Sequence, residues 1–131
     1  YSHDMLRRSE ECVLNIPGRA LLDRVVGVGS VSGEDVDKFG TYRLEAERGR
    51  RVEAPWVVDC LAHIECTVTT MLSPGDHSIF MAQVVGAWAE EEAFRDTWRT
   101  DVDEELKPMY HLGGRAFCLM GEILEWNVAE E

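Results

Sequence analysis

The chain lacks any apolar run of the roughly 18 residues that a membrane-spanning helix requires. It also lacks the apolar core of a secretory signal peptide, because charged residues such as Asp4, Arg7 and Glu10 occupy the region near its start. We therefore expect no membrane insertion. The first residue is Tyr1 and not Met, so we expect a fragment, a processed product or a chain whose first residues are absent.

Positive charge is scarce as well. Thirteen Lys and Arg stand against 25 Asp and Glu, which gives a formal net charge of −12. Nucleic-acid binding depends on basic side chains that displace counterions from phosphates. The single basic run, residues 48–51, is short, and we interpret it as a solvated loop with a phosphate-binding patch as the alternative. The composition argues against a nucleic-acid partner.

Cysteine is sparse, and no two cysteines form a CxxC pair. The chain contains Cys12, Cys60, Cys66 and Cys118. A disulfide framework is not indicated, and the spacing is simplest to interpret as cytosolic thiols, which predicts a cytoplasmic protein. Cys60-x-x-His63-x-x-Cys66 resembles metal-ligand spacing, but on a strand residues three apart point to opposite faces and six residues span roughly 20 Å. We expect no metal site there.

Motifs of hydrolytic and phosphoryl-transfer enzymes are also missing. The sequence shows no Ser/His/Asp set, no HExxH and no phosphate-binding P-loop. Gly27-x-Gly29-x-x-Ser32 resembles a dinucleotide-binding loop, yet it follows a predicted helix where that motif requires a strand. The sequence therefore shows no recognisable catalytic residues for hydrolysis or phosphoryl transfer.

What is present fits one domain over residues 1–131, with 45% apolar and 29% charged residues. Four segments favour helix. Ser2 can cap a short helix, residues 19–28 have helical apolar spacing, and Ser32 to Asp35 form a partial capping box before a brief helix that ends near Phe39. Residues 89–106 are acidic and helix-prone, with Phe94 and Trp98 four apart.

Strand signals account for more apolar surface than the helical ones. Residues 12–16 form a short strand, residues 62–69 alternate apolar and polar, and residues 77–88 are apolar on both faces. A final strand is predicted over 116–126, whereas 40–55 is polar and loop-like. A strand buried on both faces favours a closed barrel or a subunit interface. The predicted class is mainly β with helices, an α+β fold.

Two polar segments are candidate sites. Asp76-His77 lies at the mouth of the central hairpin. In one interpretation Asp76 only stabilises the turn by bonding nearby backbone amides. In the other, His77 lies at a barrel rim and faces a bound cofactor or an incoming substrate. Tyr110 and His111 precede the Gly113-Gly114 turn and are equally open to a purely structural interpretation. Spacing alone does not decide between these alternatives.

Several segments together resemble the flavin reductase-like family, in which FMN binds to a split β-barrel. They match in order and spacing over nearly the whole chain, and the Ser32-Gly33…Lys38-Phe39 and Gly75-Asp76-His77…Phe80 elements are the most specific. The other segments are Tyr1–Asp4, Glu11–Pro17, Val52–Pro55, Cys60–Cys66 and Tyr110–Gly114.

The resemblance implies a homodimer that holds FMN near its interface. It implies that Ser2, Ser32, Gly33, Lys38 and Phe39 lie around the flavin, with Tyr110 and His111 as weaker candidates for the cofactor surroundings. His77 is then the residue that faces nicotinamide or another redox partner. It also implies an N-terminal segment before Tyr1, with early barrel strands and an Asn–x–Met–Thr-type stretch, so the split barrel is expected to be incomplete at the N-terminus.

Three functions are compatible with this resemblance. The first is an NAD(P)H-dependent flavin reductase, in which Lys38 binds the flavin phosphate and His77 positions the nicotinamide. The second is an FMN electron carrier, whose acidic surface suits a basic redox partner protein. The third is a non-catalytic barrel that binds flavin or another small ligand. A thiol beside the flavin remains possible for Cys60 or Cys66.

Overall fold

The computed structural model describes residues 1–126. Its helices are α1 (Ser2–Ser9), α2 (Leu22–Gly29) and α3 (Lys38–Thr41), with the short 3-10 turns η1 (Arg19–Leu21) and η2 (Glu104–Leu106). Its strands are β1 (Glu11–Ile16), β2 (Ala46–Arg48), β3 (Pro55–Val57), β4 (Ala62–Leu72), β5 (Ile79–Ala89), β6 (Met109–Gly113) and β7 (Ala116–Leu119). None of the described helices is both long enough and apolar enough to cross a membrane.

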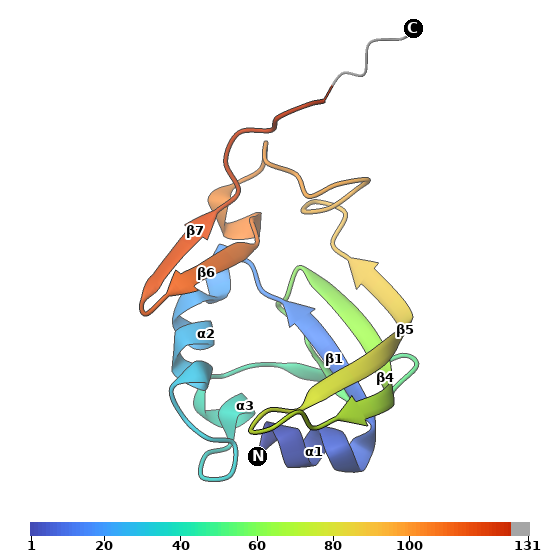
Figure 1. Cartoon of the computed structure of the whole chain (residues 1–131). Coiled ribbons are helices and arrows are strands. Elements are labelled where there is room, and N and C mark those ends of the chain that lie inside the picture. Colours follow the sequence, from blue (N-terminus) through green and yellow to red (C-terminus); the bar gives the residue numbers. More distant parts are fainter. Residues whose placement is uncertain (127–131) are drawn as a thin grey trace, which may run out of the picture.

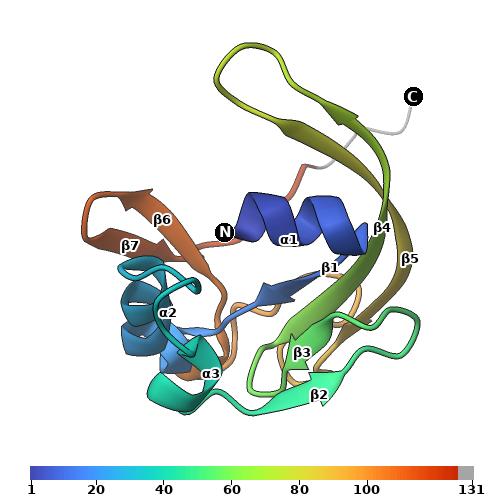
Figure 2. The ribbon, with the colours of Figure 1, turned by 90° about the horizontal axis from the view of Figure 1, so that it is seen from below.

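The strands form one antiparallel sheet and two small hairpins. The sheet has the order β1-β4-β5, and the hairpins pair β2 with β3 and β6 with β7. Figure 1 shows the β6–β7 hairpin beside α2 and away from the N-terminal end of α1. In Figure 2 the long β4–β5 hairpin curves past α1, which lies on the concave side of the sheet. This mixed α+β arrangement is the predicted fold class.

One face of the sheet is apolar. Directly opposed pairs place Leu14 beside Ile64 and Ile64 beside Ala87, and the same face carries Cys12 and Cys66. Side chains that oppose each other on neighbouring strands lie on the same face. Leu14 is 53% exposed although it is apolar, so this face is only partly covered by the described residues.

The opposite face carries a buried polar cluster beneath the β2–β3 hairpin. The Glu65 carboxylate is fully buried and accepts hydrogen bonds from the Arg50 and Arg51 amides, each at 2.7 Å, and from the Trp56 indole at 2.6 Å. His63 stacks on Trp56 with ring centroids 4.1 Å apart. Burial disfavours the imidazolium and lowers the pKa of His63. This cluster fixes the β2–β3 hairpin to the sheet.

The capping predictions were wrong in detail. Ser2 lies inside α1, whose N-cap is Tyr1 and has no side-chain capping bond. Residues 32–37 form turns, and α3 begins only at Lys38. Its cap is Asp37, whose carboxylate accepts the Phe39 and Gly40 amides at 3.1 and 3.2 Å. An Asp side chain directly before the helix satisfies the free amides better than a residue five positions earlier.

Three predicted element boundaries also need correction. Residues 40–55 are not wholly loop, because they contain β2 and the first residue of β3. Residues 89–106 contain no α-helix; Phe94 and Trp98 face each other across an isolated β-bridge with ring centroids 5.2 Å apart. The final strand stops at Leu119 and does not reach residue 126. The strands at 12–16 and 62–69 are confirmed, with β4 extended to Leu72. The strand predicted over 77–88 is β5, but it begins at Ile79 and most of its residues are exposed, so the expected burial on both faces is absent among the described residues.

Candidate functional site

The N-terminal end of α1 contacts the loop before α3. A Cβ atom added to Gly33 would lie 2.7 Å from a ring carbon of Tyr1, so a larger residue would displace the Tyr1 ring from this loop. The first amides of a helix have no partner within the helix, and the helix dipole adds partial positive charge at that end. The exposed Ser2 hydroxyl lies in this first turn. The contact therefore joins two of the predicted cofactor-binding segments, Ser2 and Ser32-Gly33.

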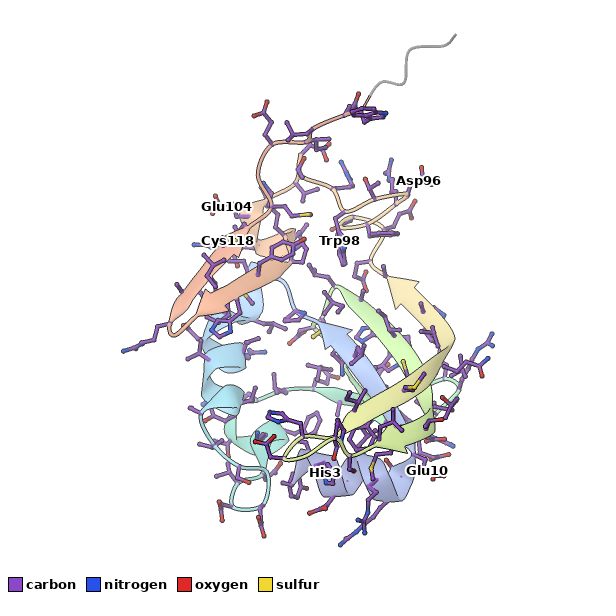
Figure 3. The ribbon with its side chains drawn as sticks, in the orientation of Figure 1. His3, Glu10, Asp96, Trp98, Glu104 and Cys118 are labelled. Atoms are coloured by element: carbon purple, nitrogen blue, oxygen red, sulfur yellow. The ribbon has the colours of Figure 1, made fainter. Side chains whose placement is uncertain are left out.

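His3 connects the same helix end to the tip of the β4–β5 hairpin. Its Nε2 atom lies 3.0 Å from the Ser78 hydroxyl, and its ring packs edge-on against Phe80 with centroids 5.5 Å apart. Its Nδ1 atom lies 3.3 Å from the Asp4 carboxylate, and this hydrogen bond holds the pKa of Asp4 below its usual value. Figure 3 shows His3 at the lower end of the molecule, on α1 beside the hairpin tip. Residues 75 positions apart in the sequence are thereby held together.

Lys38 is the first residue of α3, and its ammonium donates to the Val28 carbonyl at 2.7 Å. This bond ties α3 to α2. An ammonium group has three donors, so the Val28 bond leaves capacity for an anionic ligand. Phe39 follows with 38% of its surface exposed, so part of its ring is accessible to a ligand. Ser32 is held in its turn, where its hydroxyl accepts the Glu34 amide at 3.1 Å.

His77 is positioned at the tip of the β4–β5 hairpin, one residue before the Ser78 that contacts His3. Its side chain is 83% exposed, and its Nδ1 atom lies 2.7 Å from the Asp76 carboxylate. The aspartate orients the imidazole ring and leaves Nε2 directed away from that contact. His77 is therefore available to an incoming molecule, and its neighbour Ser78 links the tip to α1.

Tyr110 and His111 lie on β6, on a different side of the molecule. The His111 ring packs on Phe117 with centroids 4.8 Å apart, and its Nε2 atom lies 3.1 Å from the Gly114 carbonyl, so it stabilises its own hairpin. Tyr110 instead lines a cavity of about 990 Å³, together with apolar residues of the sheet and the aromatic Phe94 and Trp98. Figure 3 shows Trp98 at the end of the molecule opposite His3. The structure does not bring these two residues to the Ser2 cluster.

The cluster of Ser2, Ser32, Gly33 and Lys38 suits the phosphate end of a cofactor such as FMN. It combines a helix N-terminus, two hydroxyl groups, a glycine that lets the Tyr1 ring lie against the loop, and the Lys38 ammonium five residues further along the chain, in a chain of net charge −12. Phosphate is recognised in proteins by this set of donors. The donor set therefore fits the group that the sequence predicts.

Sequence reasoning missed His3 and the contact it makes. His3 directly follows Ser2, and Ser78 directly follows His77, so both residues adjoin predicted site residues. Nothing in the spacing indicates that they touch, because the contact depends on how the hairpin curves. Among residues 1–126 no group of three or more His, Cys, Asp or Glu side chains is placed to hold a metal ion, and Cys60 and Cys66 are free thiols.

Comparison with known proteins adds independent information on the family. The flavin reductase like domain model matches residues 1–118. The uncharacterized protein YddH of Escherichia coli (strain K12) is 31% identical over 125 residues, which cover 93% of this chain and 66% of that protein. A second relative, an uncharacterized protein of Archaeoglobus fulgidus, is 28% identical and is covered over 54% of its length.

Among solved structures, flavoredoxin of Desulfovibrio vulgaris (Miyazaki F) superposes with a TM-score of 0.83 and 23% identity. The match covers 98% of this chain and 69% of that one. At this identity the likeness shows the fold alone. The chain spans about half of one of these two relatives and about two thirds of the other. Since the family model covers residues 1–118 and the fold agrees, the chain belongs to the flavin reductase-like domain family.

Proposed function

We propose that the protein is a flavin-dependent redox protein that binds FMN and acts as an NAD(P)H-dependent flavin reductase of the cytoplasm. The observation that supports this most is the junction at the start of α1. There Gly33 meets Tyr1, and His3 meets Ser78, so the phosphate-binding donors and the His77 hairpin tip adjoin one helix end. A nucleotide cofactor and a second redox molecule could both be held at such a junction.

Each residue at the junction has a proposed part. Ser2 and the free amides of α1, together with Ser32 and Lys38, hold the flavin phosphate, and Gly33 lets its loop lie close to the start of α1. Phe39 offers an exposed aromatic surface beside them. His77, oriented by Asp76, positions the nicotinamide. Bound flavin would supply the hydride-accepting chemistry, and the protein would supply binding, orientation and charge.

The test is NAD(P)H oxidation by full-length protein with added FMN. We expect steady turnover, and we expect His77→Ala to lower kcat/KM for the nicotinamide nucleotide about tenfold, equivalent to about 1.4 kcal/mol of lost transition-state stabilisation. Ser73→Ala, an exposed change in the same hairpin loop, is the matched control and should leave turnover unchanged. Absence of turnover with both NADH and NADPH would exclude the reductase.

An electron carrier is the second candidate, and the acidic charge of the chain favours it. A net charge of −12 would steer the protein toward a basic redox partner. Slow nicotinamide oxidation combined with rapid, salt-sensitive reduction by a basic partner protein would select this function over the reductase. Association rates that do not change between low and high salt would count against it.

A further inference from the structure

Two cysteines on the apolar face of the sheet oppose each other directly. Cys12 on β1 is paired in register with Cys66 on β4. The Val68 amide donates to the Glu10 carbonyl at 2.7 Å, so Cys12 and Cys66 occupy the next hydrogen-bonded position of the antiparallel ladder. Opposed residues at such positions have Cα atoms about 5.5 Å apart. Disulfide-bonded cysteines have Cα separations of roughly 4.4–6.8 Å, and the backbone spacing of this pair lies within that range. The Cβ atoms of a hydrogen-bonded pair lie about 5.5 Å apart, so the two strands must move slightly closer for the bond to form.

The surroundings of the pair differ for the two thiols. Cys12 is half-buried, whereas Cys66 is buried. The apolar neighbours on the same face, Leu14 and Val84, are 53% and 56% exposed, so a small oxidant can reach the pair from that side. Cys60 lies outside β4 and Cys118 lies on β7, so neither has a cysteine opposite it. The juxtaposition is specific to Cys12 and Cys66.

We propose that Cys12 and Cys66 are a redox-active thiol pair that hydrogen peroxide converts into a reversible disulfide between β1 and β4. The Cys12 thiolate attacks one peroxide oxygen, the O–O bond breaks, and hydroxide leaves to take up the proton released by the thiol. Cys66 then loses its proton, its sulfur attacks the Cys12 sulfur, and the sulfenic oxygen leaves as water. Two thiols are oxidised to one disulfide, and one peroxide is reduced to two waters.

The order of events follows from exposure. Cys12 is the more accessible thiol and reacts first, and buried Cys66 resolves the sulfenic acid. Burial, together with the neighbouring Cys66, raises the pKa of Cys12. The thiolate is therefore scarce near neutral pH, and the reaction should need longer exposure than that of an activated cysteine. The product would fix the exit of α1 onto β4, because Cys12 follows that helix by three residues.

The experiment treats reduced full-length protein with hydrogen peroxide and maps its peptides without reductant. We expect a peptide containing Cys12 linked to one containing Cys66, lost again on addition of dithiothreitol, and a higher midpoint of denaturant unfolding for the oxidised protein. Cys12→Ser and Cys66→Ser should each abolish the linked peptide. Cys118→Ser, which changes an exposed thiol on another hairpin, should leave it intact.

The exposed Cys118 also serves as an internal check that peroxide has reacted. Oxidation of Cys118 without any Cys12–Cys66 linkage in the wild-type protein would overturn the proposal. That result comes from the wild-type protein, so it tests the proposal even if a serine substitution unfolds the protein. Flavin binding and nicotinamide turnover do not enter the readout, so the proposal stands or fails independently of the proposed function.

Discussion

At the scale of single residues, Glu65 is the largest fully buried side chain among residues 1–126. It is a fully buried carboxylate that accepts two backbone amides and the Trp56 indole. Burial alone would raise the pKa of Glu65, but these donors outweigh it and hold that pKa below its usual value. The residue therefore stays ionised and stabilises the fold in that form.

Glu65→Gln should destabilise the protein at pH 7 by about 2–4 kcal/mol, because an amide NH2 would replace one acceptor that faces N–H donors. The free energy of unfolding from urea titration measures the effect. Glu47→Gln is the matched control, since Glu47 is exposed on β2 and opposes Trp56 in the hairpin. Equal stability of the two variants would show that the buried bonds contribute little.

The lowered pKa of Glu65 also predicts that the stability of the protein depends on pH. A carboxyl group whose pKa is lowered by folding contributes stability that is fully present above its unfolded pKa, about 4.3, and is lost as the pH falls through the folded value. The stability difference between wild type and Glu65→Gln should therefore be largest near pH 7 and shrink below about pH 4. Urea titrations at pH 7 and pH 3 provide the comparison, and a difference that grows in acid would contradict this assignment.

At the scale of elements, helix α2 is fitted closely to Tyr42. A Cβ atom added to Gly27 would lie 2.2 Å from the Tyr42 ring, whereas one added to Gly29 would meet nothing within 4 Å. Gly27→Ala should therefore cost about 1–3 kcal/mol through overpacking. Gly29→Ala, in the same helix, should change stability by no more than about 0.5 kcal/mol. Thermal unfolding of both variants tests the pair, and similar losses would argue against the Tyr42 contact.

The contact between α1 and the β4–β5 hairpin is also testable. His3→Ala removes the bond to Ser78 and the packing against Phe80. We expect this to lower the local stability of the hairpin tip by about 1 kcal/mol, which raises the equilibrium constant for its opening about fivefold. Hydrogen exchange of the amides in residues 75–80 reports this opening. His3→Gln keeps a donor for Ser78 and should restore part of the protection. Unchanged exchange in His3→Ala would mean that the tip is held by other contacts.

Secondary structure was predictable from the sequence where apolar and polar side chains alternate. It was not predictable where specific side-chain contacts determine the path of the backbone. The alternation in residues 62–69 identifies β4, and Ser73 to Asp76 identifies its turn. The acidic segment 89–106 has helical propensity, but the Phe94–Trp98 pair folds it into an irregular loop. This contact between residues four apart, together with the full burial of Ala93, outweighs a weak helical propensity.

The candidate site was likewise predictable only in part. The resemblance indicated Ser2, Ser32, Gly33 and Lys38, and the structure brings the first three segments to one helix end through the Tyr1–Gly33 contact. The same resemblance indicated Tyr110 and His111 as weaker candidates, but β6 lies elsewhere in the molecule (Figure 1). Which distant loops meet is set by the curvature of the sheet, which no local pattern contains.

At the scale of the whole molecule, the hairpin arm of residues 70–81 exposes an apolar surface. Leu72 pairs with Ile79 and Thr70 with Met81, so Leu72, Ile79 and Met81 share a face, and each is at least half exposed. Figure 2 shows this arm extending beyond the rest of the sheet. Apolar side chains gathered on an extended arm are typical of a protein interface, and we propose this arm as a contact of the homodimer that the resemblance implies.

Ile79→Glu should therefore shift full-length protein from dimer to monomer, because a buried charge without a partner opposes association. Sedimentation velocity at micromolar concentration gives the assembly state. Gln83→Glu adds the same charge to an exposed polar position of β5 and should leave the dimer intact. A wild-type protein that sediments as a monomer would remove the arm as a dimer contact.

The most direct measurement for the whole molecule is a titration of full-length protein with FMN, followed by flavin fluorescence and visible absorption. Binding at the start of α1 predicts saturable uptake of one FMN per chain. A bulky side chain at Gly33 should weaken it at least tenfold, while Gly29→Ala leaves it unchanged. A protein that stays colourless and fails to quench flavin fluorescence at any concentration would contradict the proposed function.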